Sequence, residues 1–188
     1  MGHSILATSV GSYEGSGLSV SINPEEWRQI ARGHVYGDLW RCTRAGNHFL
    51  NLHRVTKTQK KKIRDWAVDN QYAVSASVWR YSYYDEDEET ERYFEFRTRE
   101  EAEAEVNEDV PGKITEIAGS LTATTKFNQR AMTDDQIIDF GILATIWAED
   151  TTDLDGVWWA DRLQPENLSA PKGVIVPSRI SYWDIKKA

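Results

Sequence analysis

The sequence has one cysteine, no long apolar run and no motif for nucleophilic catalysis, and each absence excludes a class of protein. Cys42 alone cannot form a disulfide framework or a cysteine-rich zinc site. No stretch of about 18 apolar residues occurs, so no transmembrane helix is expected. The sequence also lacks a glycine-rich phosphate-binding motif and the Gly-x-Ser-x-Gly pattern of a nucleophile elbow. The first residues have neither a positive stretch nor an apolar one, so no secretory signal is expected.

Positive charge is also scarce. The 188 residues include 22 Lys and Arg against 30 Asp and Glu, for a formal net charge of −8. This balance argues against a protein that binds nucleic acid through bulk positive charge. The hydrophobic fraction of 40% and the charged fraction of 28% are typical of a globular protein, which we expect to be cytoplasmic.

The negative charge is concentrated in one segment. Residues 1–80 carry 11 basic and 6 acidic residues, residues 85–109 carry 3 basic and 13 acidic, and residues 110–188 carry 8 basic and 11 acidic. One stretch of the chain therefore has a net charge of −10, which exceeds the net charge of the whole protein. The segments before and after it have net charges of +5 and −3.

The first half of the sequence predicts two helices and a hairpin. Asn23-Pro24-Glu25-Glu26 is a strong helix start and predicts a helix over about 24–32. Residues 34–43 and 47–55 are predicted to pair as a hairpin around Arg44-Ala45-Gly46-Asn47. A second helix is predicted over about 58–69, with Ile63, Trp66 and Ala67 on its apolar face.

The middle of the sequence predicts a second hairpin. Residues 71–84 alternate, with Tyr72, Val74, Ala76 and Val78 on one face and Trp79, Tyr81 and Tyr83 on the other. Residues 92–97 are predicted to pair with them, with 85–90 as the tip. Thr98-Arg99-Glu100-Glu101 is a capping box that predicts a short acidic helix.

The last third is less regular. We expect a strand over 113–126 and a second capping box at Thr133-Asp134-Asp135-Gln136. Residues 137–147 predict a buried helix, or a short helix followed by a buried strand from Gly141, because periodicity does not separate the two. Short apolar runs separated by prolines then predict strands and loops. We predict a weakly structured lead-in over 1–21 and a single α+β domain over 22–188, with a mainly antiparallel sheet and three to four helices.

The acidic segment is the most informative candidate for function. Consecutive carboxylates cannot be buried without partners, so they are solvated, bound to cations or turned toward a basic partner. No glycine follows the acids as a calcium loop requires, and no metal site or cofactor is predicted. The alternatives that remain are a solvated hairpin tip and a partner-binding surface. The candidate partner-binding residues are Tyr81, Tyr83, Tyr84, Asp85, Glu86, Asp87, Glu88, Glu89, Glu91, Glu100, Glu101, Glu103 and Glu105.

These residues suggest an acidic protein-interaction module. Carboxylates repeated along a strand and a helix can imitate the phosphates of nucleic acid, while tyrosines supply contact area, although they can equally serve sheet packing. The predicted partner is a basic protein, such as a nucleic-acid-processing enzyme that the chain inhibits. Such a chain would be a phage or mobile-element inhibitor or an immunity protein. Direct binding to nucleic acid or to a membrane is not expected.

Two other hypotheses stay open. The first is a small enzyme acting on a nucleotide-like ligand through Arg41, His34 or His48 and a carboxylate, in a pocket lined by tryptophan. The second is an oligomeric structural or assembly subunit, because the uneven charge distribution would let two copies form a homodimer.

Overall fold

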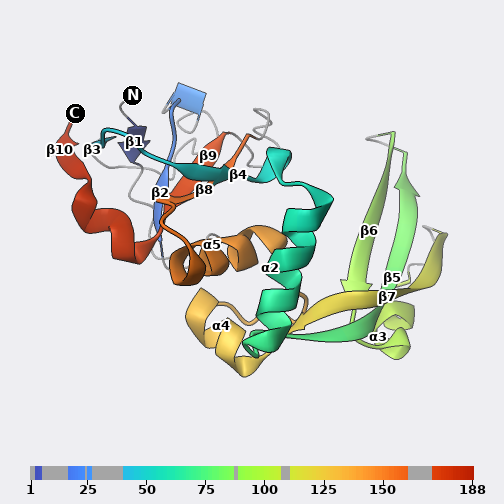
Figure 1. Cartoon of the computed structure of the whole chain (residues 1–188). Coiled ribbons are helices and arrows are strands. Elements are labelled where there is room, and N and C mark those ends of the chain that lie inside the picture. Colours follow the sequence, from blue (N-terminus) through green and yellow to red (C-terminus); the bar gives the residue numbers. More distant parts are fainter. Residues whose placement is uncertain are drawn as a thin grey trace. The chain divides into compact units, whose positions relative to one another are not determined.

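The computed structural model describes residues 3–5, 17–23, 25–26, 40–86, 89–106, 111–160 and 171–188 (Figure 1). The fold is α+β with mostly antiparallel sheets, as predicted, and three of the described helices have seven or more residues. The chain forms two compact units. The first contains Met1–Ile63, Arg130–Thr133 and Phe140–Ala188, and the second contains Arg64–Gln129 and Asp134–Asp139. Of the predicted helix over 24–32, the structure describes only Glu25 and Glu26, which are helical, and most of the lead-in lies outside the described residues. The single domain stays a prediction.

The first unit contains two small sheets. One has the order β1-β3-β10, and the other has the order β2-β9-β8-β4. The strands of the first sheet are β1 (His3–Ile5), β3 (Trp40–Thr43) and β10 (Asp184–Lys187). Those of the second are β2 (Leu18–Val20), β4 (Phe49–Asn51), β8 (Gly156–Trp159) and β9 (Lys172–Ile175).

The hairpin predicted from residues 34–43 and 47–55 is wrong. The chain does turn at Gly46, whose φ of 65° suits a residue without a side chain. However, β3 pairs with β1 and β10, while β4 pairs in parallel with β8. The physical reason lies just after the turn, where Asp155 fixes the chain. The His48 N–H donates to the Asp155 carboxylate at 2.9 Å, and the Asp155 N–H donates to the His48 carbonyl at 2.8 Å.

The expected second strand is also shorter than predicted. It ends at Asn51, and a 3-10 helix, η1 (Leu52–Arg54), follows. The Asn51 side chain accepts a hydrogen bond from the His53 N–H at 3.0 Å and so begins this turn.

The core of the first unit forms around β2, β3 and β9. Val20, Cys42, Ile175 and Trp183 are buried together, and Phe49 meets the Trp183 ring edge to face at 5.9 Å between centroids. The other partly buried side chains that pack against this cluster are Leu18, Trp158, Ile180 and Ile185. The 3-10 helix η3 (Pro177–Tyr182) leads into β10 beside it.

Helix α5 (Phe140–Thr151) confirms the first choice of a buried helix, with six consecutive buried positions from Gly141 and a seventh at Ala148. The predicted capping box before it is wrong. The Ala123 N–H donates to the Gln136 carbonyl at 2.8 Å, and the Ile138 N–H donates to the Leu121 carbonyl at 3.1 Å. These bonds to a strand hold the segment extended, so the helix begins only at Phe140. Among the described residues, no helix is long and apolar enough to cross a membrane.

The second unit contains a three-stranded antiparallel sheet of order β6-β5-β7. Its strands are β5 (Ala73–Asp85), β6 (Thr90–Phe96) and β7 (Gly112–Ala123), and α3 (Arg99–Ala104) follows β6. Helix α2 (Lys57–Asp69) precedes the sheet and confirms the prediction for 58–69. The hairpin of β5 and β6 is confirmed as well, with Trp79 opposite Phe96 and Asp85 opposite Thr90.

Two details of the second unit differ from the sequence prediction. The β5–β7 register shifts between Ala76 and Val78, so the simple alternation fails and Val74 is 54% exposed while Val78 is buried. The strand predicted over 113–126 ends at Ala123, and helix α4 (Thr125–Ala131) begins there. The Thr124 hydroxyl accepts a hydrogen bond from the Phe127 N–H at 3.2 Å, which is an N-cap that the sequence reading missed.

Candidate functional site

The acidic hairpin, which we define as residues 80–95 of β5, β6 and the turn between them, has two distinct faces. Residues directly opposite each other in antiparallel strands project to the same side. Tyr81, Tyr83 and Asp85 therefore share a face with Phe94, Arg92 and Thr90, respectively. The other face contains Arg80, Ser82 and Tyr84 opposite Glu95, Tyr93 and Glu91. Asp87 and Glu88, which were predicted for the tip, lie outside the described residues.

Arginines neutralise part of the negative charge. The Arg92 guanidinium lies 2.8 Å from the Asp85 carboxylate, and Arg80 Nε donates to Glu95 at 3.0 Å. The hydrogen bond to Glu95 raises the pKa of Arg80 above its ordinary value. Arg99 on α3 likewise contacts Glu103 at 2.7 Å, one helical turn away. These pairs hold the hairpin and the helix in place.

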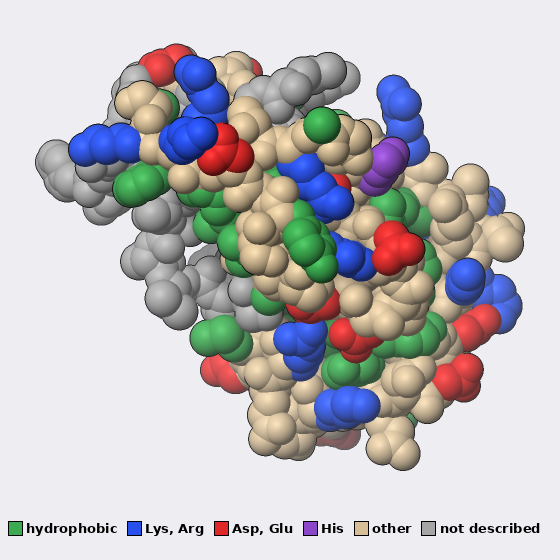
Figure 2. All heavy atoms as spheres, turned by 60° about the vertical axis from the view of Figure 1, so that its left-hand side comes forward, with side chains coloured by type: hydrophobic (Ala, Val, Ile, Leu, Met, Phe, Trp, Pro, Cys, Tyr) green, Lys and Arg blue, Asp and Glu red, His purple; other side chains and the backbone are tan. Residues whose placement is uncertain are grey.

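Three carboxylates of the tip remain open to solvent. Glu86, Glu89 and Glu91 are exposed and form no ion pair within the part of the chain that the structure describes. Glu89 has a φ of 51°, which closes the turn. By contrast, on the face of the molecule shown in Figure 2, Lys and Arg side chains lie among Asp and Glu. The exposed carboxylates of Glu86, Glu89 and Glu91 thus give this tip a group of negative charges.

Aromatic side chains are exposed on the same hairpin. Tyr84, Tyr93 and Phe94 are 58%, 56% and 52% exposed. Tyr83 stacks between Tyr81 and Phe94, with centroid distances of 5.6 and 6.0 Å. Tyr81 itself is only 3% exposed, so its ring serves sheet packing and we leave it out of the proposed surface.

Tyr93 and Phe94 were not selected from the sequence as partner-binding residues. The sequence predicted them only as part of the strand over 92–97 that pairs with residues 71–84. Exposed aromatic rings on both faces of the strand show that neither face is fully covered there. The sequence does contain one signal that could have identified them. It predicts β6 as one strand of a hairpin, and the short helix that follows is too small to cover the whole strand.

The capping box at the start of α3 is confirmed. The Glu101 N–H donates to the Thr98 hydroxyl at 3.2 Å, and the Thr98 N–H donates to the Glu101 carboxylate at the same distance. Buried Ala102 anchors the helix. The acids in and just after α3 that were predicted to bind a partner, Glu100, Glu101, Glu103 and Glu105, are all exposed. Two of them also have partners within the chain, because Glu101 caps the helix and Glu103 pairs with Arg99.

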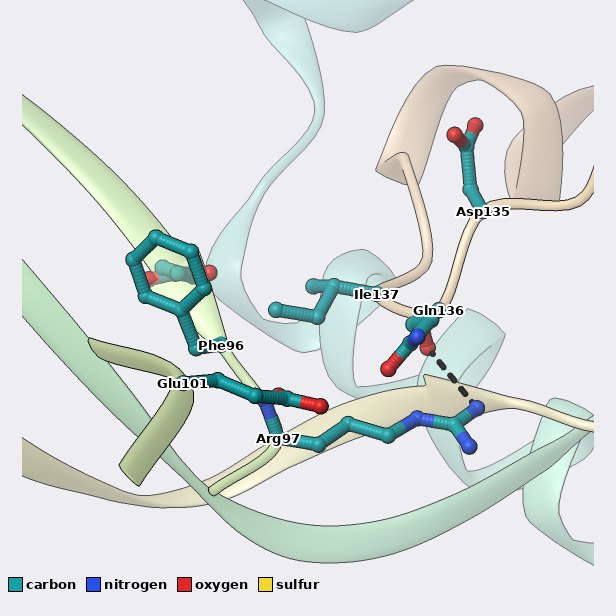
Figure 3. Close-up of a pocket in the computed structure, with 7 residues that line it drawn as sticks. Phe96, Arg97, Glu101, Asp135, Gln136 and Ile137 are labelled. Atoms are coloured by element: carbon teal, nitrogen blue, oxygen red, sulfur yellow. Dashed lines mark hydrogen bonds between the residues drawn. The ribbon is translucent and has the colours of Figure 1, made fainter. Parts of the chain in front are cut away.

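A cavity of about 320 Å³ lies where the end of β6, the start of α3 and the segment before α5 meet. It is lined by Glu95, Phe96, Arg97, Glu101, Asp135, Gln136 and Ile137. Figure 3 shows Ile137 extending toward Phe96, with Glu101 and Gln136 between the two segments and Asp135 turned away. The sequence selected only Glu101 of this set as a partner-binding residue.

The residues proposed for an enzyme are not brought together in this cavity, whose lining includes neither Arg41 nor His48. Arg41 lies on β3 opposite Lys186, and His34 is outside the described residues. Among the residues described, no three His, Cys, Asp or Glu side chains are grouped so that they could hold a metal ion.

Cys42 is fully buried on β3, as the sequence predicted for a small hydrophobic side chain. Burial raises the pKa of its thiol to about 11. The neutral thiol is therefore favoured in the fold, and its contribution to stability is complete below the unfolded pKa of about 8.5. That contribution is lost as the pH rises from this value through about 11.

We therefore expect Cys42 to resist a disulfide reagent at about pH 8, because reaction requires an accessible thiolate. The native protein should release no coloured thiolate from the reagent on mixing. The protein in denaturant should release one equivalent of that thiolate per chain, because the sequence has one cysteine. Cys42→Ser serves as the blank. Complete labelling of the folded protein within the mixing time would contradict the assignment.

Comparisons with protein-family models, with curated proteins and with solved structures find no match to this chain.

Proposed function

We propose that this protein is a cytoplasmic interaction module that binds and inhibits a basic protein, such as a nucleic-acid-processing enzyme, through the acidic hairpin and helix α3. The supporting observation is the combination of three open carboxylates and three exposed aromatic rings within one hairpin. The carboxylates are those of Glu86, Glu89 and Glu91, and the rings are those of Tyr84, Tyr93 and Phe94.

Charge and contact area have different roles in such a surface. Exposed carboxylates attract a basic partner over a distance and accelerate association, but each contributes little to affinity once the complex forms. Exposed tyrosine and phenylalanine rings provide the area that is buried on contact and slow dissociation. Tyr84 and Tyr93 are on the same face as Glu91, so both contributions coincide there.

The internal ion pairs make the surface suitable for rapid docking. Asp85 and Glu95 are already held by Arg92 and Arg80, so the hairpin needs no rearrangement to present its remaining charges. A preorganised surface loses less conformational entropy on binding than a mobile one. The proposed mechanism is steric and electrostatic occlusion of the basic groove in which the partner would hold nucleic acid.

The triple variant Glu86→Gln, Glu89→Gln and Glu91→Gln tests the proposal. We expect it to slow association with the partner about tenfold and to leave the dissociation rate nearly unchanged. Raising the ionic strength from about 0.05 M to 0.5 M should slow the wild-type protein toward the variant's rate, because salt screens the field. Surface plasmon resonance with the purified partner measures both rates.

A matched control separates local charge from total charge. Asp69→Asn, Asp153→Asn and Asp184→Asn change the net charge by the same amount at exposed positions outside the hairpin. The wild-type protein, the hairpin variant and the control variant each serve as bait in a lysate of the source organism. The partner is identified as a protein that the wild type and the control capture but the hairpin variant does not. It should be basic, and duplex DNA should compete with the chain for it. Association that is equally fast for hairpin variant and control would refute the proposal, as would capture of a second copy of the chain alone.

A further inference from the structure

The cavity beside α3 has an apolar wall on each side and a carboxylate between them. Phe96 and Ile137 come from segments far apart in the sequence, and Figure 3 shows the Ile137 side chain directed toward Phe96. The cavity volume of about 320 Å³ is near the lower end of the volumes of ligand pockets, so the cavity suits one side chain rather than a large ligand. We call Phe96, Glu101, Gln136 and Ile137 the acidic cradle.

Arg97 is the only cation among the described residues that line the cavity, and its guanidinium is bonded to backbone carbonyls. The Arg97 guanidinium donates to the Ala123 carbonyl at 3.1 Å and to the Gln136 carbonyl at 3.4 Å. In Figure 3 the Arg97 guanidinium points toward Gln136, to which it is hydrogen-bonded, and away from Phe96. Arg97 therefore joins the two segments that form the cavity, while the lining as a whole includes three carboxylates, of Glu95, Glu101 and Asp135.

Glu101 is held in one position by the cap. Its Oε2 accepts hydrogen bonds from the Arg97 N–H at 3.0 Å and from the Thr98 N–H at 3.2 Å. Both bonds use the same oxygen, and Oε1 has no hydrogen bond within the described part of the chain. A fixed carboxylate with one unused oxygen is a preorganised acceptor for a cationic donor.

We propose that the acidic cradle receives a basic side chain, arginine in preference to lysine, from the protein partner. This inference rests on the proposed function and names the group that the partner would insert. The stem of the side chain would lie between Phe96 and Ile137, and its charged head would reach Glu101 and the Gln136 amide. Arginine is favoured because a planar guanidinium can stack on the Phe96 ring while donating to a carboxylate.

Other ligand classes fit less well. An anion would meet the open oxygen of Glu101, and Arg97, the cation among the described lining residues, is already bonded to backbone carbonyls. A purely apolar ligand would remove water from the Glu101 carboxylate without replacing its hydrogen bonds, which is unfavourable. A basic side chain satisfies both the apolar walls and the open carboxylate oxygen.

The probe for a direct test is N-acetyl-arginine amide, and its neutral citrulline analogue is the matched control ligand. We expect the arginine probe to shift the amide resonances of residues 96–101 and 136–137 of the full chain in NMR titrations, with a Kd of about 1–10 mM. Citrulline has nearly the same shape without the charge, so it should bind at least about fivefold more weakly. Equal shifts from the two probes, or no shift at these amides, would overturn the proposal.

A conservative variant adds a second test. In Glu101→Gln the amide oxygen can still cap the helix, so α3 should persist while the charge is lost. The arginine probe should then bind about three- to tenfold more weakly, and circular dichroism should remain unchanged. If this variant binds the probe as tightly as wild type, the acidic cradle is not the site.

The failures of the two proposals can be told apart. The triple variant of Glu86, Glu89 and Glu91 should still bind the arginine probe at the acidic cradle, because those residues do not line the cavity. If arginine and citrulline probes bind equally well, while the triple variant still associates slowly with the partner, only the acidic cradle is refuted. If the arginine probe binds as expected, while the triple variant associates as fast as wild type, only the hairpin-mediated function is refuted.

Discussion

Asp155→Ala is expected to lower the free energy of unfolding of the first unit by about 3 kcal/mol. The Asp155 side chain is 2% exposed, and its two carboxylate oxygens have different partners. One oxygen pairs with the Arg44 guanidinium, and the other accepts the His48 N–H at 2.9 Å. The alanine variant would leave Arg44 partly buried without its counter-charge and the backbone amide without its acceptor.

The same residue also determines how β4 is placed. The Asp155 carbonyl accepts the Val176 N–H at 2.9 Å, so the residue connects the turn before β4 to the end of β9. The alanine variant keeps this backbone bond, so the loss should be concentrated at Arg44 and at the turn before β4, where the carboxylate has its partners. Thermal unfolding followed by circular dichroism should show a decrease in Tm of about 6–12 °C.

Asp153→Ala is the matched control for this prediction. It removes a carboxylate two positions away that also pairs with an arginine, Arg179, at 3.0 Å, but the Asp153 side chain is fully exposed. Solvent screens such a pair, so the Tm should not change. A similar loss of Tm in both variants would show that burial of Asp155 is not the cause.

Local patterns predicted the hairpin and its helix because the determining contacts are close in sequence. The strands β5 and β6 are joined by a short turn, and their alternating aromatic residues match the observed pairing. The capping box is closed by Thr98 and Glu101, three positions apart. Helix α2 likewise follows from its own apolar stripe.

Distant contacts explain most of the errors. The parallel pairing of β4 with β8 depends on Asp155, which is 107 positions from His48 and cannot be inferred from the turn itself. The extended segment at Gln136 is held by β7, which overrides a capping pattern that is acceptable locally. The exposed face of Val74 follows from a register shift with another strand.

In the candidate site, too, features set by neighbouring residues could be predicted from the sequence, and features set by distant contacts could not. The acidic tip could be identified from composition alone, because consecutive carboxylates have to remain solvated or meet cations. The acidic cradle could not, since Arg97 is joined to Gln136 across 39 positions and the cavity exists only once the chain is folded. The exposure of Tyr93 and Phe94 similarly depends on how little of β6 is covered by neighbouring elements.

Phe127→Ala is expected to destabilise the second unit by about 3–5 kcal/mol, because Phe127 is completely buried and its loss leaves a large cavity. Phe94→Ala removes the same ring from a side chain that is 52% exposed and stacks on Tyr83, so its cost should be below about 1 kcal/mol. Urea unfolding monitored by far-ultraviolet circular dichroism compares the two.

The pair also distinguishes the structural use of an aromatic ring from its use at a surface. If the acidic hairpin binds its partner as proposed, Phe94→Ala should accelerate dissociation several-fold while the protein remains folded, because a hot-spot ring acts after the encounter. Folded Phe127→Ala, examined well below its unfolding midpoint, should dissociate at the wild-type rate. An unchanged dissociation rate in Phe94→Ala would remove this ring from the surface and leave the interaction to the carboxylates and the exposed tyrosines.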